Sequence, residues 1–318
     1  MDIIFIKSTF NMKKKKLFVL FGLFFFLVLL QMRGSCFITQ SSNKEQKLVI
    51  VSIVPYEFFV GKISGNTIDV HSLVPPGLDV HTFEPTARST RLLLNSRGWI
   101  GIGESFEKKI TDTLRQASSS KVILTISDHL SLLQYPNTLH FHPKEPLTHT
   151  TCGGRDRHVW LSPKLIGKQI PLITNSLITM FPEHREAYLS NAKILRKEME
   201  ELDLSLQKTL APISGSTFLI SHPALGYFCK DYGLFQLSVE TDGKEPLPKD
   251  LNQILSLARE KNIKLMVVQK NYPDKGAKII AKQLQIPIYY FDPYQSNYME
   301  NLQELATVLL RNYLPVTE

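Results

Sequence analysis

The chain has 318 residues, of which 43% are hydrophobic and 21% are charged, an ordinary globular composition that is long enough for two modest lobes or one large one. The formal net charge is +8, but the first 35 residues contribute +5 of it, so the remainder carries only +3 and gives no reason to expect nucleic-acid binding.

The first 36 residues have the pattern of an export signal. Four consecutive lysines at 13–16 precede fourteen uncharged, almost entirely apolar residues at 17–30. A basic run followed by a short apolar run and small residues is typical of a secretory signal peptide, and fourteen residues are fewer than the ~20 that a spanning helix needs. We predict a signal peptide over residues 1–36, with Met12 as a candidate true start, and export to the periplasm or the cell surface.

The end of this leader leaves two alternatives open. Cys36 lies in "RGSC", where the small residues before it favour lipidation and cell-surface anchoring, whereas Arg33 favours ordinary cleavage elsewhere. The other two cysteines are Cys152 and Cys229, and two residues make no disulfide framework, although they could pair in an oxidising compartment. Cys229, in "GYFCKDYG", is expected on the buried side of a helix.

Short apolar runs alternate with helical stretches in the first half of the mature chain. Strands are predicted at 47–54, 68–74, 98–103 and 121–126, and helices at 56–65, near 87–96 and from 105. Such alternation indicates parallel strands joined by helical crossovers. Residues 127–160, with three prolines and a Gly-Gly pair, are predicted to form a long loop.

One long helix divides this half from the next. After a helix from Pro163 to about Phe181, no helix breaker occurs between Pro182 and Pro212. One apolar stripe at three- and four-residue steps runs along this stretch: Tyr188, Ala192, Leu195, Met199, Leu202, Leu206 and Leu210. Roughly 29 residues make a helix ~43 Å long, which exceeds a typical lobe, so we interpret it as a connecting backbone helix.

The alternation resumes after this helix, with strands predicted at 216–220, 234–239, 264–269 and 287–291. The fold class is therefore α/β, with two βα lobes that contain mainly parallel four-stranded sheets and are joined by one long backbone helix. The predicted boundaries are an N-terminal lobe at 47–181, the linking helix at 182–211 and a C-terminal lobe at 212–318.

Four side chains that can bind metal lie where such a fold places ligands. In open parallel sheets ligands gather at the carboxyl ends of strands. His81, His222 and Asp292 each follow a predicted strand, and His158 precedes a helix at the end of the long loop. Three imidazoles and one carboxylate suit a divalent first-row metal, and their wide spacing excludes a zinc finger. Any one of these histidines alone is more often a surface or capping residue; their shared placement predicts a metal site in an interlobe cleft.

Asp79 and Asp156 each stand two residues before a histidine, His81 and His158 respectively. An aspartate at this spacing can accept a hydrogen bond from the imidazole of a metal ligand, or it can form a turn or cap a helix. We favour the second interpretation.

At these residues the chain resembles the metal-binding cluster of periplasmic and surface substrate-binding proteins of ABC transporters. The matching stretches are "SLVPPGLDVHTFEPT", "RHVWLSPK", "SHPALGYFCKDYGL", "EPLPKDL" and "YYFDPY", which follow the family's order. The resemblance implies two lobes joined by a rigid helix and a metal held by His81, His158, His222 and Asp292. Val80 and Arg157 replace prolines of the family pattern, which affects loop stiffness more than ligand identity.

The resemblance implies a binding protein, not an enzyme, that delivers a metal to a membrane ABC permease. His222 stands where relatives tuned for manganese or iron often have glutamate, which favours zinc, with manganese or iron as the alternative. A loop with His140, His142 and His149 points the same way. We expect a monomer. A secreted zinc hydrolase is a more remote alternative, since no "HExxH" occurs, and a metal-binding adhesin is another.

Overall fold

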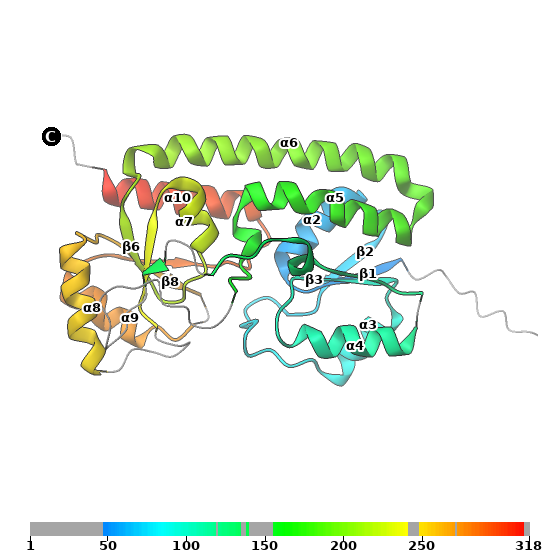
Figure 1. Ribbon diagram of the computed structural model, residues 1–318, viewed down its shortest axis with the longest axis horizontal. Coiled ribbons are helices and arrows are strands. Elements are labelled where there is room, and N and C mark those ends of the chain that lie inside the picture. Colours follow the sequence, from blue (N-terminus) through cyan, green and yellow to red (C-terminus); the bar gives the residue numbers. More distant parts are fainter. Residues whose placement is uncertain are drawn as a thin grey trace, which may run out of the picture. The chain divides into compact units, whose positions relative to one another are not determined.

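Two parallel sheets organise the chain from Lys47 onward (Figure 1). The computed structural model describes residues 47–118, 120–134, 138–139, 155–240, 248–270 and 272–314. The predicted signal peptide, Met12, Cys36, Cys152 and the three additional loop histidines lie outside these residues. In the described part of the chain, no helix has the length and apolar character needed to cross a membrane.

The first sheet has the strand order β2-β1-β3-β4, and all of its pairs are parallel. Its strands are β1 (Leu48–Val51), β2 (Asp69–Ser72), β3 (Gly98–Gly101) and β4 (Val122–Thr125). β1 and β3 are buried along their whole length, because helices cover both faces of a parallel sheet and leave its central strands no contact with water. The four predicted strands of this lobe are confirmed.

The second sheet has the order β5-β7-β6-β8-β9 and is also parallel. It contains the four predicted strands: β6 (Thr217–Ile220), β7 (Phe235–Ser238), β8 (Met266–Gln269) and β9 (Ile288–Phe291). The fifth, β5 (Thr138–Leu139), comes from the segment predicted as loop and pairs with Gln236 and Leu237 of β7. The segment that precedes the second lobe in sequence therefore adds an edge strand to that lobe's sheet.

Helices cover the sheets on both sides (Figure 1). They are α2 (Val54–Ser64), α3 (Ala87–Asn95), α4 (Glu107–Ala117), α5 (Pro163–Met180), α6 (Arg185–Leu210), α7 (Gly226–Tyr232), α8 (Pro248–Glu260), α9 (Lys275–Leu284) and α10 (Tyr298–Tyr313). The described residues also contain four 3₁₀ turns: η1 (Ile126–His129), η2 (Val159–Leu161), η3 (Pro182–His184) and η4 (Ala211–Ile213). In Figure 1, α3 and α4 lie on the side of the first sheet opposite α6, and α8 and α9 lie likewise beside the second.

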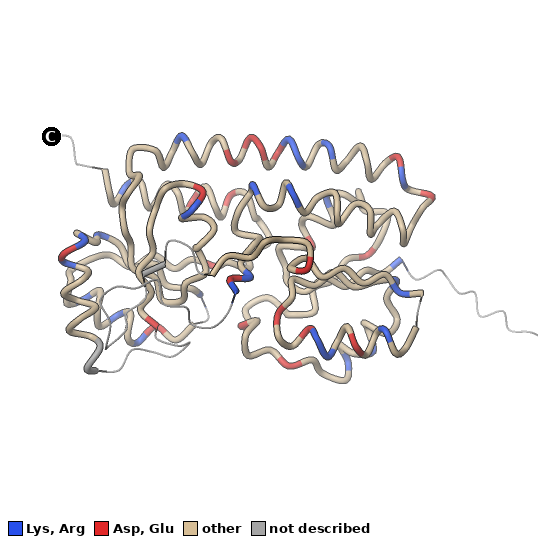
Figure 2. Tube along the Cα trace, viewed as in Figure 1, with Lys and Arg blue, Asp and Glu red and all other residues tan. Residues whose placement is uncertain are grey.

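The long helix α6 joins the two lobes as predicted. Its 26 residues make a rod about 39 Å long. All seven members of the predicted apolar stripe are buried, and α6 packs on α2 and α5 of the first lobe and on α10 of the second. Lysine and arginine alternate with aspartate and glutamate along the helix in Figure 2, where Arg196 pairs with Glu200 and Lys197 with Glu201. The apolar stripe therefore ties both lobes to one helix whose other side is charged.

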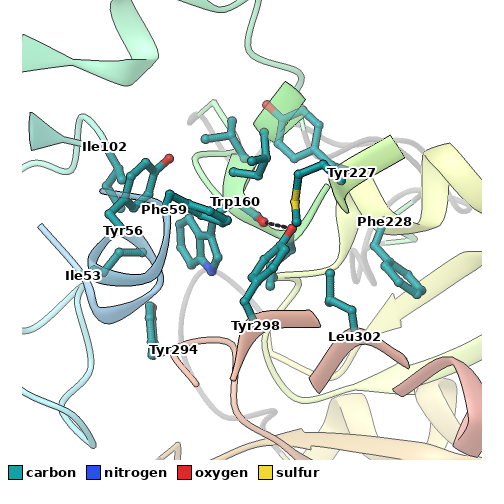
Figure 3. Close-up of a cluster of buried hydrophobic side chains, with 14 of the residues drawn as sticks. Ile53, Tyr56, Phe59, Ile102, Trp160, Tyr227, Phe228, Tyr294, Tyr298 and Leu302 are labelled. Atoms are coloured by element: carbon teal, nitrogen blue, oxygen red, sulfur yellow. Dashed lines mark hydrogen bonds between the residues drawn. The ribbon is translucent and has the colours of Figure 1, made fainter. Parts of the chain in front are cut away.

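One cluster of buried hydrophobic residues continues from one lobe into the other, and each lobe has a smaller cluster of its own. The shared cluster includes Val49 and Tyr56 of the first lobe and Phe218 and Leu302 of the second. Trp160, which is fully buried, lies where the lobes meet (Figure 3). Its indole nitrogen donates a hydrogen bond to the carbonyl of Pro293 at 2.8 Å, and its own carbonyl accepts one from the hydroxyl of Tyr298 at 2.7 Å. These two bonds fix the backbone directly after His158 to the second lobe.

Candidate metal centre

Three of the four predicted ligands meet in space. His81, His158 and His222 each offer one ring nitrogen, and these three atoms all lie within 4.8 Å of one another. His81 follows β2, His158 precedes η2, and His222 follows β6. His158 and His222 are 2% and 5% exposed, whereas the side chain of His81 is 29% exposed. The group thus has two buried members and one that reaches solvent.

Local hydrogen bonds set the backbone at each position. The carboxylate of Asp79 accepts a bond from the backbone N–H of His81 at 3.0 Å, and Thr86 caps the following helix α3 by accepting from the N–H of Ser89. In the second lobe, the N–H of Ser221 donates to Val267 of β8, so that His222 leaves the sheet edge directly after two paired strands. The backbone of His81 is therefore held by a turn, and that of His222 by the strand pairing directly before it.

Each of the three imidazoles faces a carboxylate with its Nδ1 atom. Asp156 lies 2.9 Å from Nδ1 of His158, and both carboxylate oxygens of Glu240 lie 3.0 Å from Nδ1 of His222. Glu104 lies 3.7 Å from Nδ1 of His81, which is beyond hydrogen-bond distance but close enough for strong attraction. Because an ionised carboxylate only accepts, it selects the tautomer with the proton on Nδ1 and leaves the Nε2 lone pair free.

The Nε2 atoms of His158 and His222 lie 3.3 Å apart. With both protons held at Nδ1 by the carboxylates, neither Nε2 has a hydrogen to donate, so the two lone pairs face each other. A cation between them removes this repulsion. Two nitrogens bound to one tetrahedral zinc at ~2.0–2.1 Å lie roughly 3.3–3.4 Å apart. The observed distance therefore fits one edge of a tetrahedral site that a zinc ion could occupy.

Burial and charge act differently on the histidines. Burial lowers the pKa of His222 below its ordinary value, and the attraction of Glu240 only partly offsets that effect. Burial also opposes protonation of His81, but the nearby carboxylates of Glu104, Asp79 and Glu240 together raise its pKa above the ordinary value. For Glu104, burial alone would raise the pKa, and the contact with His81 together with nearby positive charge lowers it. The carboxylates around the three histidines give the site a negative potential, which favours binding of a cation.

Asp292, the fourth predicted ligand, does not belong to the group of three. It follows β9, as predicted, and its Oδ1 atom accepts a hydrogen bond from the N–H of Tyr294 at 2.9 Å. Its backbone carbonyl accepts a bond from the side chain of Asn301. One of its carboxylate oxygens is therefore engaged in a turn of the second lobe.

Sequence reasoning did not name Glu104 and Glu240, although its own rule could have found them. Glu104 follows β3 in "GWIGIGE" and Glu240 follows β7 in "LFQLSVE", so both leave the carboxyl ends of parallel strands. For Asp79 and Asp156, the sequence favoured a role in turns over a contact with the imidazole. Asp79 forms such a turn, by accepting a hydrogen bond from the N–H of His81. Asp156 makes the same turn, at 2.9 Å to the N–H of His158, and also contacts the imidazole, so the favoured interpretation was incomplete there.

Comparison with known proteins gives a consistent result. The family described as "Zinc-uptake complex component A periplasmic" matches residues 49–312. A "Putative metal-binding protein" of Chlamydia muridarum is 30% identical over 82% of this chain and 90% of its own length. The "Zinc-binding protein AdcA" of Streptococcus pyogenes is 27% identical over 83% of this chain, which spans only 54% of that relative.

Solved structures share the fold. The crystal structure of a ZnuA deletion mutant with zinc bound aligns with a TM-score of 0.74 and 27% identity, and the match covers 85% of this chain and 99% of the other. This structural match and the family match both cover the two lobes and the helix that links them. The chain belongs to the family of the periplasmic component A of zinc-uptake complexes.

Proposed function

We propose that His81, His158 and His222 bind one zinc ion as cargo, with Asp292 as the fourth ligand, and that the protein delivers this ion to a membrane ABC permease. The observation that supports this proposal most strongly is the 3.3 Å separation of the two Nε2 atoms, each on an imidazole whose Nδ1 faces a carboxylate. Asp292 would complete the set by turning its second oxygen toward the histidines, a local movement of the loop after β9.

The protein is a metal-binding component of transport and not an enzyme, as its family membership shows. The zinc-hydrolase alternative is therefore set aside. Binding and release, without turnover, are what a carrier requires, and a full set of protein ligands would leave no open position for a catalytic water.

Zinc is favoured over manganese and iron by the donor atoms. Three imidazole nitrogens form a site softer than the oxygen-rich sites that suit manganese. The relatives also point to zinc, because AdcA is named a zinc-binding protein and the ZnuA deletion mutant holds zinc. Export of the mature chain, with Cys36 as a candidate lipid anchor, would place this site outside the cytoplasm, where a permease could receive its cargo.

A competition experiment tests the proposal. The processed protein is stripped of metal with a chelator, and zinc and manganese are titrated separately and in competition by calorimetry, for the wild type and for His222→Glu. We expect one zinc per chain, a strong preference for zinc, and a narrower preference in the variant, because a carboxylate oxygen replaces a nitrogen. Preferential manganese binding by the wild type would refute zinc as the cargo. Binding of neither metal at one per chain would refute the site itself.

A further inference from the structure

We propose that Glu240 is a positioning residue that holds the imidazole of His222 in the orientation in which Nε2 faces the metal. This inference rests on the proposed function, because it takes His222 to be a zinc ligand. It assigns a role to a side chain outside the four-ligand set.

The fold places Glu240 beside His222 by strand pairing. β6 and β7 are parallel neighbours with Ile220 opposite Ser238, so His222 and Glu240 each lie two residues beyond that pair at the same sheet edge. The N–H of Glu240 donates a hydrogen bond to the carbonyl of Ser221 at 3.3 Å, which continues the ladder past the end of both strands. The side chain of Glu240 is 11% exposed. Its carboxylate therefore reaches the imidazole from a backbone that is itself held in place.

Three aromatic rings pack around the imidazole of His222. The centroids of His81, His158 and Tyr272 lie 4.9, 5.1 and 5.0 Å from the centroid of His222. A half-turn of the imidazole about its bond to Cβ would exchange Nδ1 with Cδ2 and Nε2 with Cε1, while the ring keeps nearly the same shape. A carboxylate at 3.0 Å removes that ambiguity, because it attracts an N–H and not a C–H group.

Glu240 can be tested more cleanly than the equivalent partner of His158. Asp156 accepts a hydrogen bond from the backbone N–H of His158 as well as contacting its ring, so its removal would disturb the turn and the imidazole together. The hydrogen bonds described for the Glu240 carboxylate both go to the imidazole of His222. A change at Glu240 therefore alters the orientation of one ligand and leaves the described turn around it intact.

The experiment compares Glu240→Ala and Glu240→Gln with the wild-type protein and with Glu260→Ala, a control at an exposed position at the end of α8. Zinc affinity is measured by chelator competition. Loss of an outer partner of a metal-bound histidine typically costs 10–100-fold in affinity, and we expect about this loss for Glu240→Ala. Glu240→Gln should recover part of it, because an amide oxygen can still accept from Nδ1–H.

Nitrogen chemical shifts of the histidine rings give a readout that a merely structural role would not move. In the zinc-loaded wild type we expect His222 with Nε2 bound to the metal and a proton on Nδ1. In Glu240→Ala we expect a mixture of ring orientations, while the apo protein keeps the wild-type thermal midpoint.

Two outcomes would overturn the inference. One is a Glu240→Ala protein that binds zinc within twofold of the wild type, with His222 still bound through Nε2; the proposed function would stand in that case, because the wild type binds zinc. The other is an equal loss in the Ala and Gln variants that is matched by a fall in the thermal midpoint of the apo protein. If the wild type itself binds no zinc, the proposed function fails and the role of Glu240 fails with it.

Discussion

The two buried histidines and the exposed one are held by different means. His158 and His222 have carboxylates at 2.9 and 3.0 Å from Nδ1 and almost no exposed surface. The Nδ1 atom of His81 lies 3.7 Å from the carboxylate of Glu104, and its side chain is 29% exposed. The buried pair therefore has its orientation set before any metal arrives, whereas the outer histidine retains freedom to turn.

This difference follows from where the residues stand in the fold. His158 lies two residues before Trp160, whose hydrogen bonds to Pro293 and Tyr298 join the lobes, and His222 lies directly after a buried strand. His81 belongs to a loop before α3 with several exposed residues, among them Leu78, which is 50% exposed. The fixed half of the site is built into the junction of the lobes. Exchange of a metal is expected on the side of His81.

The largest effect is expected from removing either member of the buried pair. His158→Ala and His222→Ala each delete a proposed ligand, so zinc affinity should fall by more than the ~100-fold that loss of an outer partner costs. Chelator competition measures this loss, and His71→Ala, at an exposed position in β2, serves as a histidine control. Affinities close to that of the wild type in both variants would show that the pair does not bind the metal.

A smaller loss is expected for His81→Ala. The remaining pair keeps its orientation, and water can replace an exposed ligand more readily than a buried one, so affinity should fall less than in His158→Ala or His222→Ala. Stopped-flow transfer of zinc to a chelator should also be faster in this variant than in the wild type. If His81→Ala lowered zinc affinity as much as His158→Ala, the proposed difference between the two fixed histidines and the more mobile His81 would be wrong.

The pH dependence of zinc binding should be governed by the outer histidine. Zinc binds neutral imidazole, so a proton competes with it wherever the free histidine is charged. The pKa of His81 is raised above its ordinary value of 6.5, chiefly by Glu104 acting against burial, whereas that of His222 is lowered. As pH falls, His81 becomes protonated before His222, and affinity should fall with a slope approaching about tenfold per pH unit. His81→Ala should flatten this slope. An unchanged slope would assign the competing proton to another group.

Local sequence patterns predicted most of the fold because most of it is decided locally. The apolar stripe from Tyr188 to Leu210 predicted the buried face of α6. The apolar runs in the sequence predicted buried strands such as β1 and β6. The buried position predicted for Cys229 is also confirmed. β5 was missed, since two residues carry no periodic pattern and their strand character comes only from pairing with β7.

The candidate site divides in a similar way. The rule that ligands follow parallel strands selected His81 and His222, and the structure brings both together with His158. Glu104 and Glu240 were not predicted, because the imidazole partners proposed from the sequence, Asp79 and Asp156, stand two residues before their histidines, whereas Glu104 and Glu240 lie on other strands. Which carboxylate faces which ring depends on strand order, such as the pairing of β6 with β7, and one sequence does not reveal that order. The role of Asp292 as a ligand stays a prediction.

The smallest effect on zinc affinity is expected from a change at Glu107. This residue acts on His81 only indirectly, through the turn that carries Glu104. Its buried carboxylate accepts hydrogen bonds from the hydroxyl of Ser52 and from the N–H groups of Ile102 and Gly103, in the turn that carries Glu104. Glu107→Gln keeps one acceptor oxygen. Zinc affinity should therefore fall by less than the ~10-fold that loss of a direct outer partner costs.

The stability of the apo protein should show the change at Glu107 much more clearly. Burial raises the pKa of Glu107 from 4.5 to about 7, so between these values the folded protein binds a proton that the unfolded chain does not. The free energy of unfolding should therefore fall as pH rises through this range, by up to about 3 kcal/mol from this group alone. In Glu107→Gln that contribution is absent, and in Glu200→Gln, at an exposed position on α6, it is retained. Urea unfolding at pH 5 and pH 8 measures the difference. Equal pH dependence in the wild type and Glu107→Gln would show that the buried carboxylate is ionised throughout, and the turn that carries Glu104 would then be held by charge and not by a neutral acid.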